Sequence, residues 1–357
     1  MIPLNVNTDP EGTVSASETT LSRFFKSMIR DERDLPFIYL TIKISAILFP
    51  LAVLLYLPFI PSWIFWPAAI VYLVINNKMK SPFGLMAHCA AHRTLFNKKF
   101  HLLNLYFPWV LAPFFGQSPE TYFAHHIVMH HPENNLPEDK SCTMFYQRDS
   151  KRDFCRYWAS FFFTGVFQLA IYFIHKKKYP YVFRVVAGEF IFLGGCIGLC
   201  FLNWQATLVV FIIPFLASRL VMMAGNWVQH AFVSAEQPDN AYMNSITCIN
   251  TKFNHNCWND GYHASHHIRP GMHWTEHPAY FRSTLDEFAK NNAVVFDGID
   301  YSNVFGWLMT KRYDLLANHF VNVGNRFTSD EEVIALLKER TKKIPKPYHA
   351  VTTVSQS

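Results

Sequence analysis

Histidine is unevenly distributed along this 357-residue chain, and most of its 17 histidines gather in three short groups. The first group is His-Cys-Ala-Ala-His at 88–92, the second is His-His-Ile-Val-Met-His-His at 125–131, and the third is His-Ala-Ser-His-His at 263–267. Long apolar segments separate the groups. Since neutral imidazole is a common metal ligand, this arrangement predicts a metal site assembled at one face of a lipid bilayer.

The spacing within the groups is that of a helix face. Residues three or four apart share one face of an α-helix, so His88 and His92 can direct two imidazoles at one ion. His263, His266 and His267 offer a pair on one face and an adjacent ring turned aside, which would let one helix serve two ions. Imidazole suits iron, zinc, copper or nickel rather than magnesium or calcium. We expect a structural role for the isolated histidines His101, His175, His319 and His349.

The composition is that of a membrane protein. Hydrophobic residues make up 50% of the chain and charged residues only 16%, so long stretches carry almost no charge. The net charge of +6 is concentrated beside the apolar segments, where it fits anionic lipid headgroups better than nucleic acid. The seven cysteines form no Cys-x-x-Cys pair, and we expect all of them to be reduced, with no disulfide framework.

Four apolar runs predict two helical hairpins across the membrane. The longest are long enough for a span of roughly 20 residues. Turns are expected at 58–62 in the first hairpin and at Asn203 in the second. The runs are 37–57 and 63–75 in the first hairpin, and 185–202 and 204–224 in the second.

Basic residues flank both hairpins at one end, whereas neither far turn carries a charge. By the positive-inside rule the basic ends are cytoplasmic, which places all three histidine groups on the cytoplasmic side, in the endoplasmic reticulum or a bacterial inner membrane. The basic residues are Arg23, Lys26, Arg30 and Arg33 before the first hairpin, Lys78, Lys80, Arg93, Lys98 and Lys99 after it, and Lys176, Lys177, Lys178 and Arg184 before the second.

Two further apolar runs, 100–115 and 158–174, are harder to place. The first contains Asn104, Pro108 and Pro113 and is too broken for a comfortable span, and the lysines after the second belong inside. We interpret both as interfacial or re-entrant helices. In the alternative, both runs cross the membrane, the number of spans is six, and the second histidine group lies outside.

The expected fold is therefore an all-α integral membrane protein with four transmembrane helices in two hairpins, interfacial helices and a cytoplasmic helical cap that carries the metal site. The expected parts are a disordered tail and juxtamembrane amphipathic segment at 1–34, a membrane domain at 35–280, the cap at 281–345 and a disordered tail at 346–357.

Local signals support helices in the cap and a polar tail before the first span. Met1–Thr20 is polar and lacks the basic-then-apolar order of a signal peptide. In the cap, 285–290 and 304–316 look like short helices, and Thr328-Ser-Asp-Glu331 is a capping box that opens a further helix.

Glu189 and Arg219 are ionisable residues within the second hairpin. They stand fourteen residues before and sixteen after the turn at Asn203, and therefore at similar depth. Charges at such depth usually pair or line a polar cavity. We expect a structural ion pair near the cytoplasmic end, the alternative being two independent side chains that reach outward.

At its histidine groups the chain resembles the membrane fatty acid desaturase superfamily, whose signature is His-x(3–4)-His followed by two copies of His-x(2–3)-His-His. The hairpin plan is similar too, so the resemblance covers roughly residues 35 to 280. The run from Asn259 to Trp274 looks like members described as desaturase-like. The matching residues are His88, His92, His126, His130, His131, His263, His266 and His267.

The resemblance implies a two-iron centre that reduces dioxygen and abstracts hydrogen from an unactivated C–H bond of a lipid or fatty-acyl chain. Many members carry an acidic residue where this chain has Cys89. No His-Pro-Gly-Gly haem motif occurs, so electrons are expected from a separate cytochrome b5-like or ferredoxin-like donor. No nucleic-acid-binding motif is present.

Other functions remain compatible with the pattern. A relative of the same superfamily could hydroxylate a lipid, or act on a carotenoid as hydroxylase or ketolase. Zinc is a further option, because histidines alone do not select iron over zinc. A metal transporter is disfavoured, since transporters need ligands near the bilayer midplane and these histidines lie at the ends of the spans.

The resemblance also suggests a ninth ligand. The three groups supply eight histidines, whereas two ions with four or five ligands each and an open position need about nine. Related desaturases place an additional His, preceded by an Asn four residues earlier, after the fourth span. His230 is then expected as the ninth ligand and Asn226 as a contact to one metal, directly or through water. The alternative is a buried histidine that bonds to backbone.

Within the second group, His125 and His126 compete for one ligand position. His126 stands four residues before His130 and shares its helical face, whereas His125 stands five before it, about 140° away at 3.6 residues per turn. We expect His126 to bind metal and His125 to support the site. Asp260 is expected beside the ligands as well.

Overall fold

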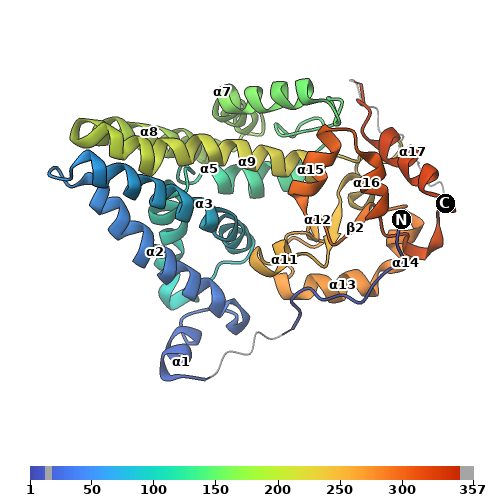
Figure 1. Ribbon diagram of the computed structural model, residues 1–357, viewed down its shortest axis with the longest axis horizontal. Coiled ribbons are helices and arrows are strands. Elements are labelled where there is room, and N and C mark those ends of the chain that lie inside the picture. The colour runs from blue at the N-terminus through green and yellow to red at the C-terminus, as the bar shows by residue number, and fades with distance from the viewer. Residues whose placement is uncertain (13–17, 346–357) are drawn as a thin grey trace.

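The structure, a computed structural model, describes residues 1–12 and 18–345. Helices dominate it, as the sequence predicts. Two long helical hairpins form one lobe of the molecule, and short helices around a two-stranded sheet form the other, which we call the cap lobe (Figure 1). His349 and the expected tail at 346–357 lie outside the described residues.

The first hairpin consists of α2 (Leu35–Tyr56) and α3 (Ser62–His92). Prolines at positions 58 and 61 separate the two helices at the expected turn. The second helix is longer than its apolar run predicts, because it continues past the polar stretch 76–80. Lys80 therefore lies inside α3, where it is buried with Nζ 3.4 Å from the carbonyl oxygen of Pro214. The first histidine group forms the last turns of this helix.

The second hairpin consists of α8 (Tyr179–Thr207), a short π-helix η5 (Leu208–Ile212) and α9 (Ile213–Gln229). Its turn is at Asn203, as predicted, where φ −158° and ψ 100° interrupt the helix. The tips of the two hairpins are in contact, as the distance of 2.7 Å between the Tyr56 and Thr207 hydroxyls shows. Both hairpins extend away from the cap lobe side by side (Figure 1).

Among the described residues, three helical stretches are long and apolar enough to cross a membrane: Glu32–Tyr56, Lys151–His175 and Tyr179–Gln229. Helix α3 is not among them, since its apolar part ends at the polar stretch 76–80. The hairpins expose large apolar side chains, as a lipid-facing surface requires. These include Val53, Phe59, Trp63, Ile70, Phe190, Ile197, Phe201 and Leu202.

The helix α7 (Lys151–His175), which contains the second doubtful apolar run, lies across the base of the second hairpin. Near its start, the Tyr157 hydroxyl accepts a hydrogen bond from Asn226 at the end of α9 (2.6 Å). Near its end, the Tyr172 hydroxyl donates to Glu133, just after the second histidine group (2.6 Å). Both ends of α7 therefore lie at the same end of the hairpin, far from its tip.

The other doubtful run, 100–115, is broken into short helices. The chain passes through η2 (Lys98–Leu105), the π-helix η3 (Phe107–Leu111) and α4 (Ala112–Phe114). None of the three is long enough to span a bilayer.

The remaining helices are short and frame the histidine groups and the cap lobe. Before the hairpins and around the second group they are α1 (Thr20–Lys26), η1 (Glu32–Asp34), α5 (Thr121–Phe123), η4 (Ala124–His130) and α6 (His131–Glu133). After α9 they are α10 (Ala241–Asn244), α11 (Lys252–Asn256), α12 (His263–Ile268), η6 (Trp274–Glu276), α13 (His277–Ser283), α14 (Leu285–Lys290), α15 (Tyr301–Met309), α16 (Tyr313–Asn318), η7 (Val323–Asn325) and α17 (Asp330–Arg340).

The cap lobe also contains a small sheet, which the all-α prediction did not include. Strand β1 (Thr247–Ile249) pairs in parallel with β2 (Val295–Asp297), and all six residues are buried. The sheet joins a segment before the expected boundary at 280 to one after it. Three-residue strands are too short for a periodic sequence pattern to show.

Two expectations for the cap helices need correction. The predicted helix 304–316 is two helices, because Lys311 adopts a left-handed conformation (φ +58°) that ends α15 and starts α16. The last helix, α17, is capped by Ser329, whose side chain accepts from the Glu332 backbone, and not by Thr328. The predicted helix at 285–290 is confirmed as α14.

Residues 1–12, which the sequence placed in a disordered tail, make defined contacts with the cap lobe. These residues cross the cap lobe (Figure 1), where Ile2 pairs with Val321 in an isolated bridge. Farther along, the carboxylate of Asp9 is buried and hydrogen-bonded. The tail is polar, but its polar side chains find partners in the cap lobe, which composition alone does not reveal.

The expected ion pair within the second hairpin is confirmed. Arg219 Nη2 lies 2.5 Å from Glu189 Oε1, and both side chains are 11% exposed. The other carboxylate oxygen of Glu189 accepts a hydrogen bond from the Ser118 hydroxyl at 2.6 Å. The pair therefore ties α8 to α9 and to the loop before the second histidine group.

Replacing Arg219 alone should destabilise the protein strongly, because Glu189 would keep a buried, uncompensated charge. Losing one partner of a buried pair costs about 3–5 kcal/mol. We expect Arg219→Leu to lower the melting temperature in detergent, and Glu189→Leu combined with Arg219→Leu to recover much of the loss. The exposed pair Arg312–Asp314 is the control, since its removal should leave the melting temperature unchanged. A small effect of Arg219→Leu would show that the pair carries little stability.

Candidate metal centre

The structure brings the three histidine groups and His230 together at the base of the hairpins. Their ring nitrogens form two clusters, and within each cluster the candidate ligand atoms all lie within 4.8 Å of one another. Cluster A consists of His88, His92, His126, His131 and His266, and cluster B of His130, His230, His263 and His267. The nine members are the nine residues that the sequence predicts as ligands.

Cluster A brings together three separate parts of the chain. The last turns of α3 supply His88 and His92. The Nε2 atom of His266, on α12, lies 2.9 Å from that of His88 and 2.9 Å from that of His131. His131 Nε2 in turn lies 3.1 Å from His126 Nε2. Two nitrogens bound to one ion at about 2.0–2.1 Å and near-tetrahedral or right angles stand about 3 Å apart, so these spacings are those of a shared ion.

Cluster B has the same geometry. His263 Nε2 lies 3.2 Å from His230 Nε2 and 3.0 Å from His267 Nε2. The ring of His130 packs edge-to-face against the rings of His230 and His267, with centroids 5.3 and 5.2 Å apart. Because α12 supplies members to both clusters, this one short helix links them. On this helix, His263 and His267 form the pair that shares one cluster, and His266 is the ring turned aside toward the other.

A π-helix divides the second histidine group between the clusters. The segment η4 (Ala124–His130) has i→i+5 hydrogen bonding, which brings residues five apart onto one face. His126 therefore shares a face with His131 in cluster A, and His130 points into cluster B. The α-helical spacing predicted His126 rather than His125, but it wrongly placed His126 on the face of His130.

His125 lies beside the site and in neither cluster. Its ring is nearly parallel to that of His130, with centroids 6.2 Å apart, and its other face meets Phe161. Its Nε2 atom is buried, with no hydrogen-bond partner among the described residues. Burial lowers the pKa of His125 to about 4, so the ring is neutral at physiological pH.

Hydrogen bonds fix the tautomer of two cluster members. The Nδ1 atom of His130 lies 2.7 Å from Asp139 Oδ2, and that of His230 lies 2.9 Å from the Asn244 carbonyl oxygen. Since these oxygens accept hydrogen bonds, Nδ1 carries the proton in both rings and Nε2 keeps its lone pair. His88 Nδ1 lies 3.3 Å from Asp260 Oδ1, which places a carboxylate beside a third member.

Of these three supporting residues, the sequence identified Asp260 and missed Asp139 and Asn244. Asp139 is buried and also accepts from the backbone and hydroxyl of Ser141. Burial alone would raise the pKa of Asp139, but the neighbouring His130 lowers this pKa to about 2. A carboxylate nine residues after a histidine is an ordinary pattern, and nothing in the spacing marked this one.

The clusters fit metal ions. Burial holds the pKa of His126, His263 and His267 well below the usual range, so these rings are neutral, as ligands must be. Nε2 of His92 is buried and has no hydrogen-bond partner among the described residues. Converging lone pairs repel one another unless a cation lies between them. Imidazole-only sites suit iron, zinc, copper and nickel.

Asn226 lies one turn before His230, as expected, but its amide nitrogen is already engaged. Nδ2 donates to the Ser141 carbonyl oxygen (3.0 Å) and to the Tyr157 hydroxyl (2.6 Å). These contacts attach α9 to α7 and to the loop that contains Asp139. A contact between Asn226 and a metal remains a prediction.

The other histidines lie outside the clusters. His273 bonds to Asp34 and Thr275, and His277 bonds to Ser265 on α12. His101 and His319 each contact a backbone carbonyl oxygen, and His175 is exposed. No disulfide is present among the described residues, which include all seven cysteines.

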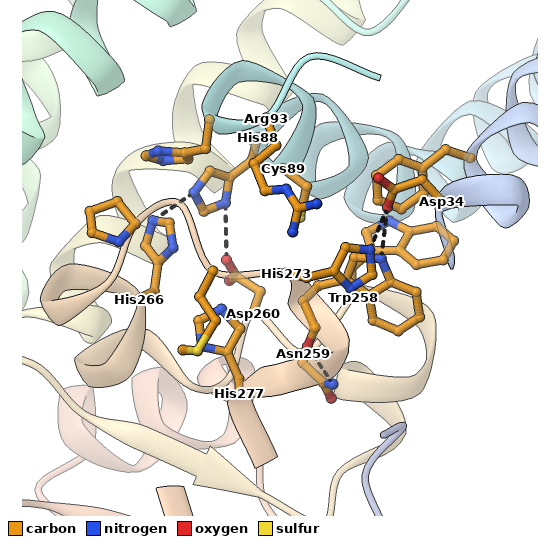
Figure 2. Close-up of a pocket in the computed structure, with 15 residues that line it drawn as sticks. Asp34, His88, Cys89, Arg93, Trp258, Asn259, Asp260, His266, His273 and His277 are labelled. Carbon is orange, nitrogen blue, oxygen red and sulfur yellow. Dashed lines mark hydrogen bonds and ion pairs between the residues drawn. The ribbon is translucent and has the colours of Figure 1, made fainter. Parts of the chain in front are cut away.

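A pocket lined by both polar and aromatic side chains opens beside cluster A (Figure 2). His88 and His266 form one wall, with the Asp260 carboxylate 3.3 Å from His88 Nδ1, and Arg93 extends from the end of α3. Opposite, His273 and Trp274 bond to Asp34. The position at which many desaturases have an acidic residue is Cys89, which also lines this pocket, and burial raises the pKa of its thiol.

A second pocket opens on the hairpin side, and the ring of His125 separates it from His130 of cluster B. It lies between α7, α9 and the loop that precedes the second histidine group. The surface that its wall exposes is mostly apolar, although polar side chains also line it. Its side chains are Gln117, Ser118, Thr121, Tyr122, His125, Phe161, Val166, Leu169, Arg219 and Met222, with Gly116 and Gly165 completing the wall.

The comparisons with known proteins support a single assignment. The family model described as fatty acid desaturase matches residues 61–298, well over half of the chain. The match contains all nine cluster histidines. No curated protein and no solved structure matches the chain.

Replacing the two adjacent histidines of the second group, one at a time, separates their roles. We expect His126→Ala to lose metal, because it removes a nitrogen that points into cluster A, and His125→Ala to keep it. Metal per chain, measured by plasma mass spectrometry after gel filtration, distinguishes the two. Loss of metal from the His125 variant alone would reverse the assignment.

Proposed function

Because this chain belongs to the fatty acid desaturase family, we propose that it is a membrane oxidoreductase whose nine clustered histidines hold two iron ions. Its reaction would be the dioxygen-dependent desaturation of a fatty-acyl or other lipid chain. The observation that carries this proposal is the division of nine histidines into two adjacent clusters of ligand spacing. Iron held there would supply the redox chemistry, with dioxygen as co-substrate, that breaks an unactivated C–H bond.

The protein's own part is to hold and shield this chemistry. Asp139, Asn244 and Asp260 orient His130, His230 and His88 by binding their outer nitrogens. Such supporting hydrogen bonds raise the basicity of the ligand and fix its ring. Burial of the clusters keeps bulk water from the reacting carbon, which limits side reactions.

The apolar pocket beside cluster B suits the lipid chain. It faces the hairpins rather than the cap lobe, and Phe161, Val166, Leu169 and Met222 supply an apolar wall. A long saturated chain offers no polar group for recognition, so shape and apolar contact must position it. In our proposal the chain enters between α7 and α9 and presents one C–H bond to the metal centre.

We also propose four spans with the metal centre on the cytoplasmic side. Support comes from the uncharged hairpin tips, the basic bases and the position of α7 across the base of the second hairpin. If α7 lies at the membrane interface and does not cross the membrane, the second and third histidine groups are on the same side of the membrane. Electrons would come from a separate cytochrome b5-like or ferredoxin-like donor on that side.

Metal analysis together with lipid profiling tests this proposal. Purified protein should contain about two iron ions per chain, and cells that express it in air should gain unsaturated lipids. His230→Ala should lose metal and the lipid change, whereas His319→Ala, which alters a histidine outside both clusters, should keep both. Products heavier by one oxygen atom would instead identify a hydroxylase. Wild-type protein with no iron, or with unchanged lipids, would contradict the proposal.

Narrowing the apolar pocket should reduce turnover without affecting metal content. Val166→Trp places a large ring into the wall between α7 and α9. Phe163→Trp, on the same helix, is the matched control, because Phe163 is 69% exposed and faces away. We expect at least a tenfold loss of product for Val166→Trp and none for the control, with both variants holding wild-type iron. Equal activity of the two would place the lipid elsewhere.

A further inference from the structure

The N-terminal segment 2–12, here called the strap, runs across the cap lobe to the third histidine group (Figure 1). It begins beside residues 320–322, where the Ile2 amide donates to the Phe320 carbonyl oxygen at 2.9 Å. It continues past Asp297, which accepts a hydrogen bond from Asn5 at 2.8 Å. Near its end, Pro10 accepts from the Asn259 side chain at 2.7 Å.

Asp9 is the anchor of the strap. Its carboxylate is buried (6% exposed) and accepts hydrogen bonds from the backbone of Asn250 (2.8 Å) and Thr251 (3.3 Å). It also accepts from the Tyr262 hydroxyl at 2.7 Å. No Lys or Arg pairs with it among the described residues. A buried carboxylate placed among uncharged donors is a costly arrangement, so these three hydrogen bonds must compensate for its burial.

The three donors lie at the two ends of one segment, residues 250–262, which contains the short helix α11 and leads into α12. This segment is conformationally demanding, because Asn250, Trp258 and Asn259 all have φ near +55°. Left-handed conformations are unfavourable for non-glycine residues and persist where their surroundings hold them. The carboxylate of Asp9 therefore clamps the beginning and the end of the segment together.

Helix α12 depends on such anchors for its position. It has six residues, far fewer than an isolated helix needs for stability in water. Tyr262, which is fully buried, precedes its first residue, and Asn7 donates a second hydrogen bond to the Tyr262 hydroxyl at 2.6 Å. A shift of Tyr262 would carry α12 with it.

A shift of α12 would disturb both metal positions at once. Its His266 belongs to cluster A, while its His263 and His267 belong to cluster B. Of the segments that supply cluster members, α12 and the second histidine group are the two that reach both clusters. The position of α12 thus sets the spacing of the two ions.

We propose that Asp9 is a positioning residue for the metal centre. Its carboxylate holds the two ends of segment 250–262 together and thereby fixes the position of the third histidine group. The strap is then part of the metal site's framework, although more than 240 residues of sequence separate Asp9 from His263. This inference rests on the two-metal centre proposed above.

Cobalt(II) binding tests this role, since its visible absorption reports ligand geometry independently of turnover. Asp9→Asn keeps the size of the side chain but cannot accept all three hydrogen bonds. Loss of a residue that bonds directly to a metal ligand typically weakens metal affinity 10–100-fold. Asp9 acts on His263 through Tyr262, so we expect a loss of about tenfold, at the lower end of that range, together with an altered cobalt spectrum. Tyr262→Phe removes one donor and should show a smaller loss in the same direction.

The matched control is Glu11→Gln in the same strap. Glu11 pairs with Arg282 at the surface, and its loss should leave the cobalt spectrum and affinity unchanged. If Asp9→Asn lowers the melting temperature but binds cobalt with wild-type affinity and spectrum, Asp9 is merely structural and the inference is wrong. Wild-type protein that binds no cobalt would contradict the two-metal centre itself, and this inference with it.

Discussion

Nine imidazoles meet in a largely buried space with ring nitrogens of neighbouring members about 3 Å apart, and much of the surrounding structure serves to keep them there. Within each cluster, lone pairs converge, which is unfavourable without a cation. Hydrogen bonds from Nδ1 to Asp139 and Asn244 commit His130 and His230 to this orientation, and the Asp260 carboxylate lies beside Nδ1 of His88. The clusters therefore make sense as a metal centre and are hard to explain as packing alone.

The hairpins provide the rigid base for this centre. Helices α3 and α9 bring the first histidine group and His230 to one end of the lobe that the two hairpins form. The buried pair Glu189–Arg219 ties α8 to α9 just beyond that end, and α7 closes the base. The cap lobe then presents α12 from the opposite side. Because the two lobes meet at the clusters, metal binding and the packing of the lobes are coupled.

Much of this arrangement could be predicted from local sequence. Apolar runs bounded by turn residues predicted both hairpins, and even the turn at Asn203. Histidine spacing on α-helices predicted the pair His88 with His92, and a pair with one ring turned aside among His263, His266 and His267. The pairing of Glu189 with Arg219 followed from their equal depth. In each case the relevant interaction is set by a short stretch of chain or by the membrane itself.

What the sequence did not reveal depends on long-range contacts or on departures from α-helical geometry. The π-helix η4 assigns His126 and His130 to different clusters, although a regular α-helix would have placed them on one face. The partners of the outer nitrogens, Asp139 and Asn244, are recognisable only once the chain is folded. The N-terminal strap has a polar composition typical of a disordered tail, and its order comes from donors some 240 residues away.

The most direct test of the two-cluster centre is the metal's own coordination shell. X-ray absorption on the iron-loaded protein should show four to five imidazole nitrogens per ion, at about 2.0–2.2 Å if iron–nitrogen bonds resemble those of zinc. It should show no sulfur ligand, because Cys89 belongs to neither cluster. A sulfur-containing shell, or one with only one or two imidazoles per ion, would contradict the account.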